Sequence, residues 1–156
     1  MVTIRLAGAE DIEQVAALRM AFLKEMNPSS PESETTLLSL TRQYITEKLP
    51  TGEFLVWFAE EDGKIVGTGG LIFSHRPPTA NNTSILQAYI LNMYTVPQHR
   101  GRGIATMLLQ HIIEYVKTTP AQRIALQASE MGQHIYEKFG FKSSNRYMTL
   151  ALQKPD

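Results

Sequence analysis

The 156-residue chain has 15 basic and 15 acidic residues, so its formal net charge at neutral pH is zero. This balance argues against a partner bound through a global electrostatic field, such as nucleic acid or an anionic membrane, and any anion site must be local. The chain has no cysteine, which excludes disulfides, thiolate metal sites and a cysteine nucleophile. Its length and its 43% hydrophobic content predict one globular domain over residues 1–156.

The N-terminal sequence MVTIRLAGAEDIEQ becomes acidic before any apolar run as long as a signal peptide requires. Nowhere do 18 apolar residues follow one another. Neither a secretory signal nor a transmembrane helix is predicted. We therefore expect a cytoplasmic protein without a membrane partner.

The first third of the chain predicts one strand and two helices. Residues 2–6 alternate apolar and polar side chains, as a short strand does. Asp11 is expected to cap a helix with apolar residues at the 3.6-residue period. The prolines within residues 27–36 indicate a loop, and a second helix is expected over residues 35–49.

The remaining elements follow in a strand-rich order. Apolar strands are expected at residues 54–59 and 65–73, joined by an Asp-Gly hairpin turn. After a loop at 75–83, the predicted elements are a strand at 84–96, a helix after the RGRG sequence, a strand at 123–128, a helix at 131–139 and a strand at 147–152. The order β-α-α-β-β-β-α-β-α-β predicts a mixed α/β fold.

The stretch VPQHRGRGIATMLLQHIIEYVK, residues 96–117, places two arginines and two glycines before an amphipathic helix. The first turn of this helix is expected at Gly101 to Ala105. Its first amides have no partner within the helix and lie at the positive end of the helix dipole. Gly101 and Gly103 leave those amides accessible, and Arg100 and Arg102 add charge suited to phosphate oxygens. The pattern predicts a seat for a phosphate-bearing ligand, with a solvated basic turn as the alternative.

Two common phosphate motifs do not fit this stretch. A P-loop requires a lysine after the glycines, and a Rossmann fingerprint requires a glycine at position 106, which is Thr106. The sequence RGRGIA, Arg100 to Ala105, instead resembles the signature Arg/Gln-x-x-Gly-x-Gly/Ala of the GNAT superfamily, the GCN5-related N-acetyltransferases. The sequence HIYEKFGF at residues 134–141 resembles the family's last helix motif, and the order of elements matches along nearly the whole chain.

The resemblance implies a GNAT fold, in which about four helices flank a mixed, mostly antiparallel sheet of six to seven strands that is splayed between strands 4 and 5. Acetyl-CoA, the implied donor substrate, would lie in that splay. The backbone of Met93, Tyr94 and Thr95 would pair with the pantetheine arm. The residues that would hold the diphosphate are Arg100, Gly101, Arg102, Gly103, Ile104, Ala105 and Thr106. Ser129 stands where many members have an asparagine that faces the pantetheine.

Tyr136 is the catalytic residue implied by the resemblance, as the acid that protonates the departing CoA thiolate. A phenol with a pKa near 10 can serve a thiolate with a pKa near 8.5 only when it is well positioned. Without the family, the alternative is a core tyrosine. The base is less defined, because the strand SILQAYILNMYT contains no carboxylate and neither Gln87 nor Asn92 can accept a proton. The remaining candidates for the base are ordered water and a glutamate of the 27–36 loop, Glu32 or Glu34.

The resemblance implies acetyl transfer to a primary amine, on a small molecule or a peptide, directly within a ternary complex. The alternative is a CoA-binding sensor or interaction module that keeps the fold without turnover. The four histidines have no metal-binding spacing, so no metal is expected, and nucleic-acid binding through RGRG is disfavoured by the zero net charge. Loops 27–36 and 75–83 are expected to frame the acceptor. A homodimer is compatible with the family, but no residue pattern specifies its interface.

Overall fold

The computed structural model describes residues 1–144 and 146–152. Its helices and strands, in chain order, are β1 (Thr3–Leu6), α1 (Ile12–Met26), α2 (Pro31–Lys48), β2 (Phe54–Glu61), β3 (Lys64–His75), β4 (Leu86–Thr95), α3 (Ile104–Lys117), β5 (Ile124–Leu126) and α4 (Gln133–Lys138). This order confirms the expected α/β arrangement up to the last predicted strand. In the described residues, none of the helices combines the length and apolar character needed to cross a membrane.

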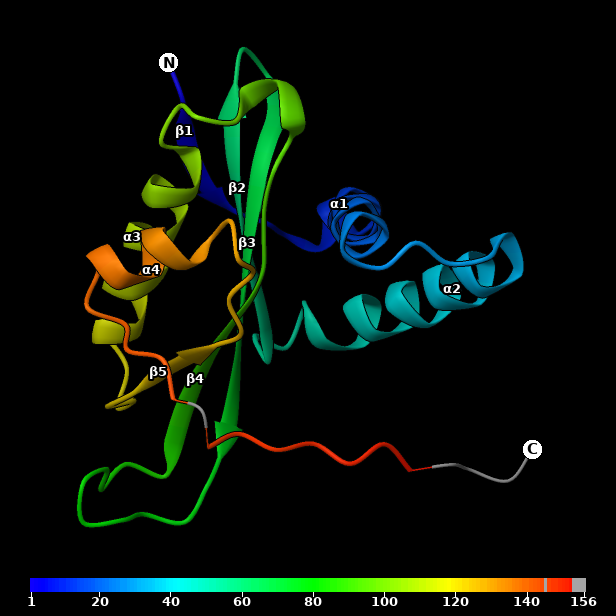
Figure 1. Cartoon of the computed structure of the whole chain (residues 1–156). Helices are drawn as coiled ribbons and strands as arrows, with labels where there is room; N and C mark the ends of the chain where they lie inside the picture. The colour runs from blue at the N-terminus through cyan, green and yellow to red at the C-terminus, as the bar shows by residue number, and fades with distance from the viewer. Residues whose placement is uncertain (145, 153–156) are drawn as a thin grey trace.

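The strands form one sheet in the order β1-β2-β3-β4-β5. Neighbouring strands are antiparallel except for β4 and β5, which are parallel. Helices α1 and α2 lie on one face of the sheet, and α3 and α4 lie on the other (Figure 1). The mixed, mostly antiparallel sheet predicted from the family resemblance is confirmed.

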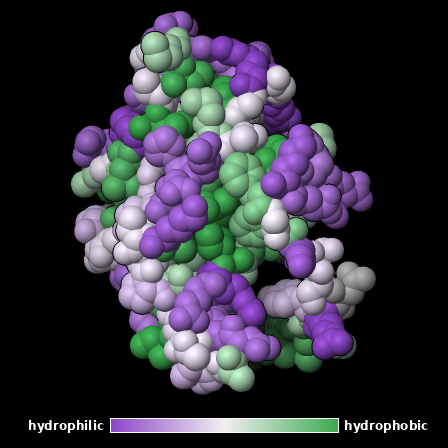
Figure 2. Space-filling model, turned by 90° about the vertical axis from the view of Figure 1, so that its left-hand side faces the viewer, coloured by the Kyte–Doolittle hydropathy of each residue, from purple (hydrophilic) through white to green (hydrophobic). Residues whose placement is uncertain are grey.

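The amphipathic pattern of residues 96–117 produces a buried helix face. The side chains of α3 that are at most 3% exposed are Ile104, Leu108, Leu109, Ile112 and Val116, and they pack with the sheet in one apolar cluster. A second cluster joins α1 and α2 to the opposite face of the sheet. Seen from the side of α3 and α4, hydrophilic and hydrophobic residues are interspersed over the surface (Figure 2). The α3 stripe is thus turned inward and anchors the start of this helix on the sheet.

The expected strand at residues 147–152 is wrong, and the described sheet has five strands rather than six or seven. Residues 146–152 lead away from the sheet (Figure 1), and Tyr147, Met148 and Leu150 are 84–91% exposed. Alternating β-prone side chains form a strand only where a neighbouring backbone completes the hydrogen-bond ladder. This segment has no such neighbour in the described part of the chain.

The loop predicted at residues 27–36 is shorter than expected, because α2 already begins at Pro31. The Ser30 hydroxyl accepts a hydrogen bond from the Ser33 amide at 3.3 Å, which makes Ser30 the N-cap. A proline at the first helical position is favourable, since its missing N–H would have had no partner there. Glu32 and Glu34 consequently lie in the first turn of α2 and not in a loop.

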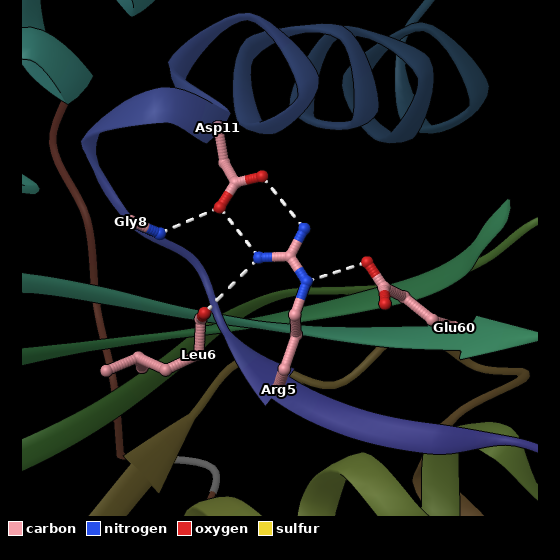
Figure 3. A network of polar contacts seen from close by, with 5 residues as sticks. All are labelled: Arg5, Leu6, Gly8, Asp11 and Glu60. Carbon is pink, nitrogen blue, oxygen red and sulfur yellow. Dashed lines mark hydrogen bonds and ion pairs between the residues drawn. The ribbon is translucent and has the colours of Figure 1, made fainter. Parts of the chain in front are cut away.

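Asp11 occupies the expected N-cap position of α1, but its side chain makes no capping hydrogen bond. Its carboxylate instead accepts two hydrogen bonds from Arg5, at 2.7 and 2.8 Å, and one from the Gly8 amide at 2.8 Å. The Arg5 Nε also donates to Glu60 on β2 at 2.7 Å (Figure 3). The paired hydrogen bonds to a guanidinium are stronger than a neutral cap, so Asp11 fastens β1 to the start of α1.

Candidate functional site

The sheet opens between β4 and β5. The two strands pair only where Ala88, Tyr89 and Ile90 face residues 124–126, whereas β4 continues to Thr95. Residues 91–95 therefore have no strand partner on the β5 side in the described chain. This confirms the expected splay and leaves backbone N–H and C=O groups on that edge of β4 free for a ligand.

A β-bulge lies in the same part of β4. Thr68 and Gly70 of β3 face Tyr94 and Leu91, so one β3 residue stands opposite two residues of β4. One of the two, Asn92, has a φ of 56°, which lies in the left-handed region that asparagine tolerates better than most residues. The bulge twists the end of β4 and so separates it from β5.

The bulge also decides the faces to which neighbouring side chains point. Leu91 packs in the cluster on the α1 and α2 side, and the Asn92 side chain accepts a hydrogen bond from Arg19 of α1. Met93 points to the α3 side, where a Cβ placed on Gly69 would lie 2.7 Å from its Sδ. Two consecutive side chains of β4 thus face α1, which an unbulged strand does not allow.

The predicted pantetheine-binding residues lie at the open edge. The side chain of Met93 is part of the core, as an ordinary strand residue would be. Tyr94 contacts Phe22 of α1 edge to face at 6.5 Å, and the Arg100 guanidinium lies 5.6 Å from its ring centre. The carbonyl oxygen of Thr95 accepts a hydrogen bond from Arg100 Nε at 3.0 Å. These contacts fix the end of β4 while its β5 edge stays open.

The turn after β4 places two glycines at the start of α3. Gly101 and Gly103 have φ values of 74° and 78°, and α3 begins at Ile104 with Gly103 as its N-cap, slightly later than the predicted first turn. The amide of Met107 bonds to the Gly103 carbonyl at 3.0 Å, so residues 104–106 have amides that precede the first intrahelical bond. A Cβ on either glycine would meet no atom within 4 Å. A side chain at either glycine would therefore enter open space.

Both arginines of this turn are bound to carboxylates from distant segments. Arg100 Nη2 contacts Glu25 of α1 at 2.7 Å, and Arg102 contacts Glu61 of β2 at 2.6 and 2.8 Å. The guanidinium groups in turn lower the pKa of Glu25 and of Glu61. Sequence reasoning assigned both arginine charges to a phosphate and missed the two glutamates. No local pattern marks the glutamates, because the pairs join residues 75 and 41 positions apart.

Tyr136 and Ser129, the other two predicted site residues, follow β5: Tyr136 lies in α4 and Ser129 in the segment before it. Tyr136 is partly buried against the α3 cluster and contacts Phe141 edge to face at 5.9 Å. Burial raises the pKa of its phenol, so the group is a protonated donor at neutral pH. The Ser129 hydroxyl accepts a hydrogen bond from the Gly132 amide at 3.2 Å and so caps the turn that leads into Tyr136.

Arg19 is a residue of the site that sequence reasoning missed. It is half-buried in α1, at a spacing of four after Val15 and three before Phe22, and its guanidinium donates to Asn92 on the bulge. An arginine within an apolar helical stripe was the signal that could have revealed it. The proposed bases lie differently: Glu34 is 3.4 Å from Lys24 across the α1 and α2 pair, and β4 contains no acidic residue.

The sequence matches the family described as "Acetyltransferase (GNAT) family" over residues 15–141. A predicted acetyltransferase from Clostridium acetobutylicum, crystallised with acetyl-CoA, superposes with a TM-score of 0.85 at 30% identity and covers 97% of this chain and 96% of its own. A GCN5-related N-acetyltransferase from Ralstonia eutropha superposes with a TM-score of 0.87 at 25% identity, covering 97% and 99%.

Two curated relatives are similar in sequence. An uncharacterized N-acetyltransferase of Bacillus subtilis is 29% identical over 134 residues, which are 83% of this chain and 79% of the relative. A probable N-acetyltransferase family 8 member 5 of Mus musculus is 27% identical over 124 residues. These are 78% of this chain but 51% of the mouse protein, so the chain spans about half the length of that relative.

Proposed function

Because the chain belongs to the acetyltransferase (GNAT) family, we propose that it transfers an acetyl group from acetyl-CoA to a primary amine, directly and within a ternary complex. The observation that supports this most is the continuity of the open β4 edge, residues 91–95, with the glycine turn at the start of α3. An extended arm with amides followed by a diphosphate is the kind of ligand that such a surface fits.

In this proposal the pantetheine amides bond to the backbone of Met93, Tyr94 and Thr95 along the free edge. The diphosphate rests on the amides of residues 104–106, in the open space in front of Gly101 and Gly103. The positive charge that balances the diphosphate comes mainly from these amides and the helix dipole. Arg100 and Arg102 contribute less, because Glu25 and Glu61 already neutralise them.

Direct acetyl transfer requires three chemical steps. The acceptor ammonium first loses a proton to water, the free amine then attacks the thioester carbonyl, and the tetrahedral intermediate expels the CoA thiolate. Tyr136 gives its phenolic proton to that thiolate. The attacking nitrogen carries an excess proton after the attack and releases it to solvent, which leaves a neutral amide, and the Tyr136 phenolate takes a proton back from solvent. The chain has no cysteine to hold an acyl group, which favours direct transfer over an acyl-enzyme.

A panel of polyamines, aminoglycosides, amino acids and lysine peptides, assayed for release of free CoA, tests the proposal. We expect turnover with at least one of these classes. A CoA-binding module without turnover is the second candidate, and the lack of any acidic residue on β4 favours it. Calorimetric binding of CoA without turnover of any amine would select this second function, and no binding of CoA would refute both.

A further inference from the structure

Arg19 differs from the other arginines that are shielded from solvent. Three arginines of the described chain are at least partly shielded, namely Arg5, Arg19 and Arg100. Arg5 contacts Asp11 and Arg100 contacts Glu25, each at 2.7 Å. Among the described residues, no carboxylate lies within ion-pair distance of Arg19. Its hydrogen-bond partner there is the neutral amide oxygen of Asn92.

This arrangement leaves the half-buried charge of Arg19 without a carboxylate partner in the described part of the chain. A guanidinium does not lose its proton in proteins and has five N–H donors, and the Asn92 oxygen engages one of its nitrogens. Burial lowers the pKa of Arg19, which reflects the cost of desolvating the cation. Asn92 itself has a φ of 56° within the bulge. Non-glycine residues in the left-handed region cluster at active sites and ligand-binding sites.

The pair adjoins the unpaired stretch of β4 to which the pantetheine arm would bind in the proposed function. Asn92 is two residues beyond Ile90, the last β4 residue paired with β5, so it borders the opening. Its side chain faces α1, whereas Tyr136 belongs to the cluster on the α3 side. Helix α1, which contains Arg19, and helix α4, which contains Tyr136, thus lie on opposite faces of the sheet (Figure 1).

We propose that Arg19, positioned by Asn92, binds the carboxylate of the acceptor, so that the substrate is a primary amine that also bears a carboxylate, such as an amino acid. The proposal rests on the acetyl-transfer function proposed above. A carboxylate matches a single planar guanidinium in charge and in its two-oxygen geometry. A phosphate dianion would leave a second charge unmatched, and a polyamine would place more positive charge beside Arg19.

The first test compares amino acids with their carboxamides in the CoA-release assay, with phosphoethanolamine and spermidine as the other arms. We expect kcat/KM for the acids to exceed that for the carboxamides about ten- to a hundred-fold, the effect of one charge-assisted contact. Equal use of acids and amides, or preference for the phosphate or the polyamine, would overturn the proposal.

The second test uses Asn92→Asp and Arg19→Gln, with Arg123→Gln, an exposed arginine just before β5, as the matched control. Asn92→Asp supplies an internal carboxylate to Arg19 and keeps a residue type that tolerates positive φ. We expect this variant to melt at a higher temperature and yet to lose the preference for acids, as Arg19→Gln does. A merely structural Arg19 predicts unchanged discrimination in Asn92→Asp, and that result would contradict the proposal. Arg123→Gln should change neither property.

Binding measurements separate this proposal from the proposed function. Calorimetry on the CoA-saturated protein compares each amino acid with its carboxamide, and needs no turnover. Selective binding of acids that disappears in Asn92→Asp supports the Arg19 subsite even if no amine is acetylated. Turnover of amines without any selectivity for acids would refute the subsite and leave acetyl transfer intact.

Discussion

Substitution of Gly103 by alanine tests the diphosphate seat more sharply than removal of a charged residue. Gly103 has φ 78° and ψ 9°, and a Cβ there would meet no protein atom within 4 Å. The only folding cost is the left-handed backbone, about 1–2 kcal/mol for an L-residue. For a chain of this size we expect the melting temperature to fall by about 2–4 °C for each kcal/mol.

The added methyl group should cost more in ligand binding than in folding. It would enter open space directly before α3, the region where we propose that the diphosphate binds. Losing one charge-assisted hydrogen bond, about 1.5–3 kcal/mol, corresponds to a decrease in CoA affinity of roughly ten- to a hundred-fold. Pantetheine lacks the diphosphate, so calorimetry should show its affinity unchanged.

Gly52 provides the matched control. It has a φ of 75°, and a Cβ there would likewise meet no protein atom within 4 Å, but it lies in the turn between α2 and β2. Gly52→Ala should destabilise the fold as Gly103→Ala does, measured by denaturant unfolding, and bind CoA normally. If the two variants bind CoA equally well, the seat at the start of α3 is refuted.

Three further predictions concern Tyr136, Asp11 and Arg102. Tyr136→Phe should lower kcat about a hundred-fold with CoA affinity unchanged, and an unchanged kcat in the variant would reject the acid role. Because burial raises the pKa of Tyr136 above its ordinary value, wild-type kcat should not fall through loss of this proton between pH 7 and 9. Asp11→Asn should cost about 2 kcal/mol of unfolding free energy at pH 7. Since Arg5 lowers the pKa of Asp11, that stabilisation is complete above the unfolded value near 3.9 and disappears as the pH falls through the folded value, so urea unfolding at pH 7 and pH 3 checks the sign. Arg102→Gln should weaken CoA binding less than about threefold, because Glu61 already neutralises the arginine; a loss of tenfold or more would show that Arg102 leaves Glu61 for the ligand.

Local sequence patterns predicted most helices and strands, because periodicity and turn residues act within a few positions along the chain. The buried stripe of α3 and the Asp-Gly hairpin follow from periodicity and turn chemistry. Pairing is not local, and residues 147–152 have strand-like alternation without a neighbouring strand in the described chain. The start of α2 was misplaced for a different reason: Pro31 was interpreted as a helix breaker, although it follows the Ser30 cap and occupies the position where proline is favourable.

The candidate site likewise combines features that the local sequence determines with contacts between distant residues. The turn from Arg100 to Gly103 was predictable, since glycines with positive φ before a helix leave a recognisable sequence signature. The partners of its arginines were not predictable, because Glu25 and Glu61 come from other elements. Arg19 is intermediate: its place in an apolar helical stripe was visible in the sequence, whereas its contact with Asn92 depends on the bulge.

The one-residue bulge in β4 connects the donor and acceptor parts of the site. Without the extra residue, the alternation of the strand would turn Asn92 toward the α3 face, since a shift of one position exchanges the two faces. With it, Leu91 and Asn92 both face α1 while Met93 returns to the α3 side against Gly69. The same irregularity ends the pairing with β5 and exposes the edge proposed for pantetheine. The bulge therefore lies next to the edge proposed for pantetheine and also turns the Asn92 side-chain amide toward Arg19. In the proposed function, acetyl-CoA and the acceptor would meet at this part of β4.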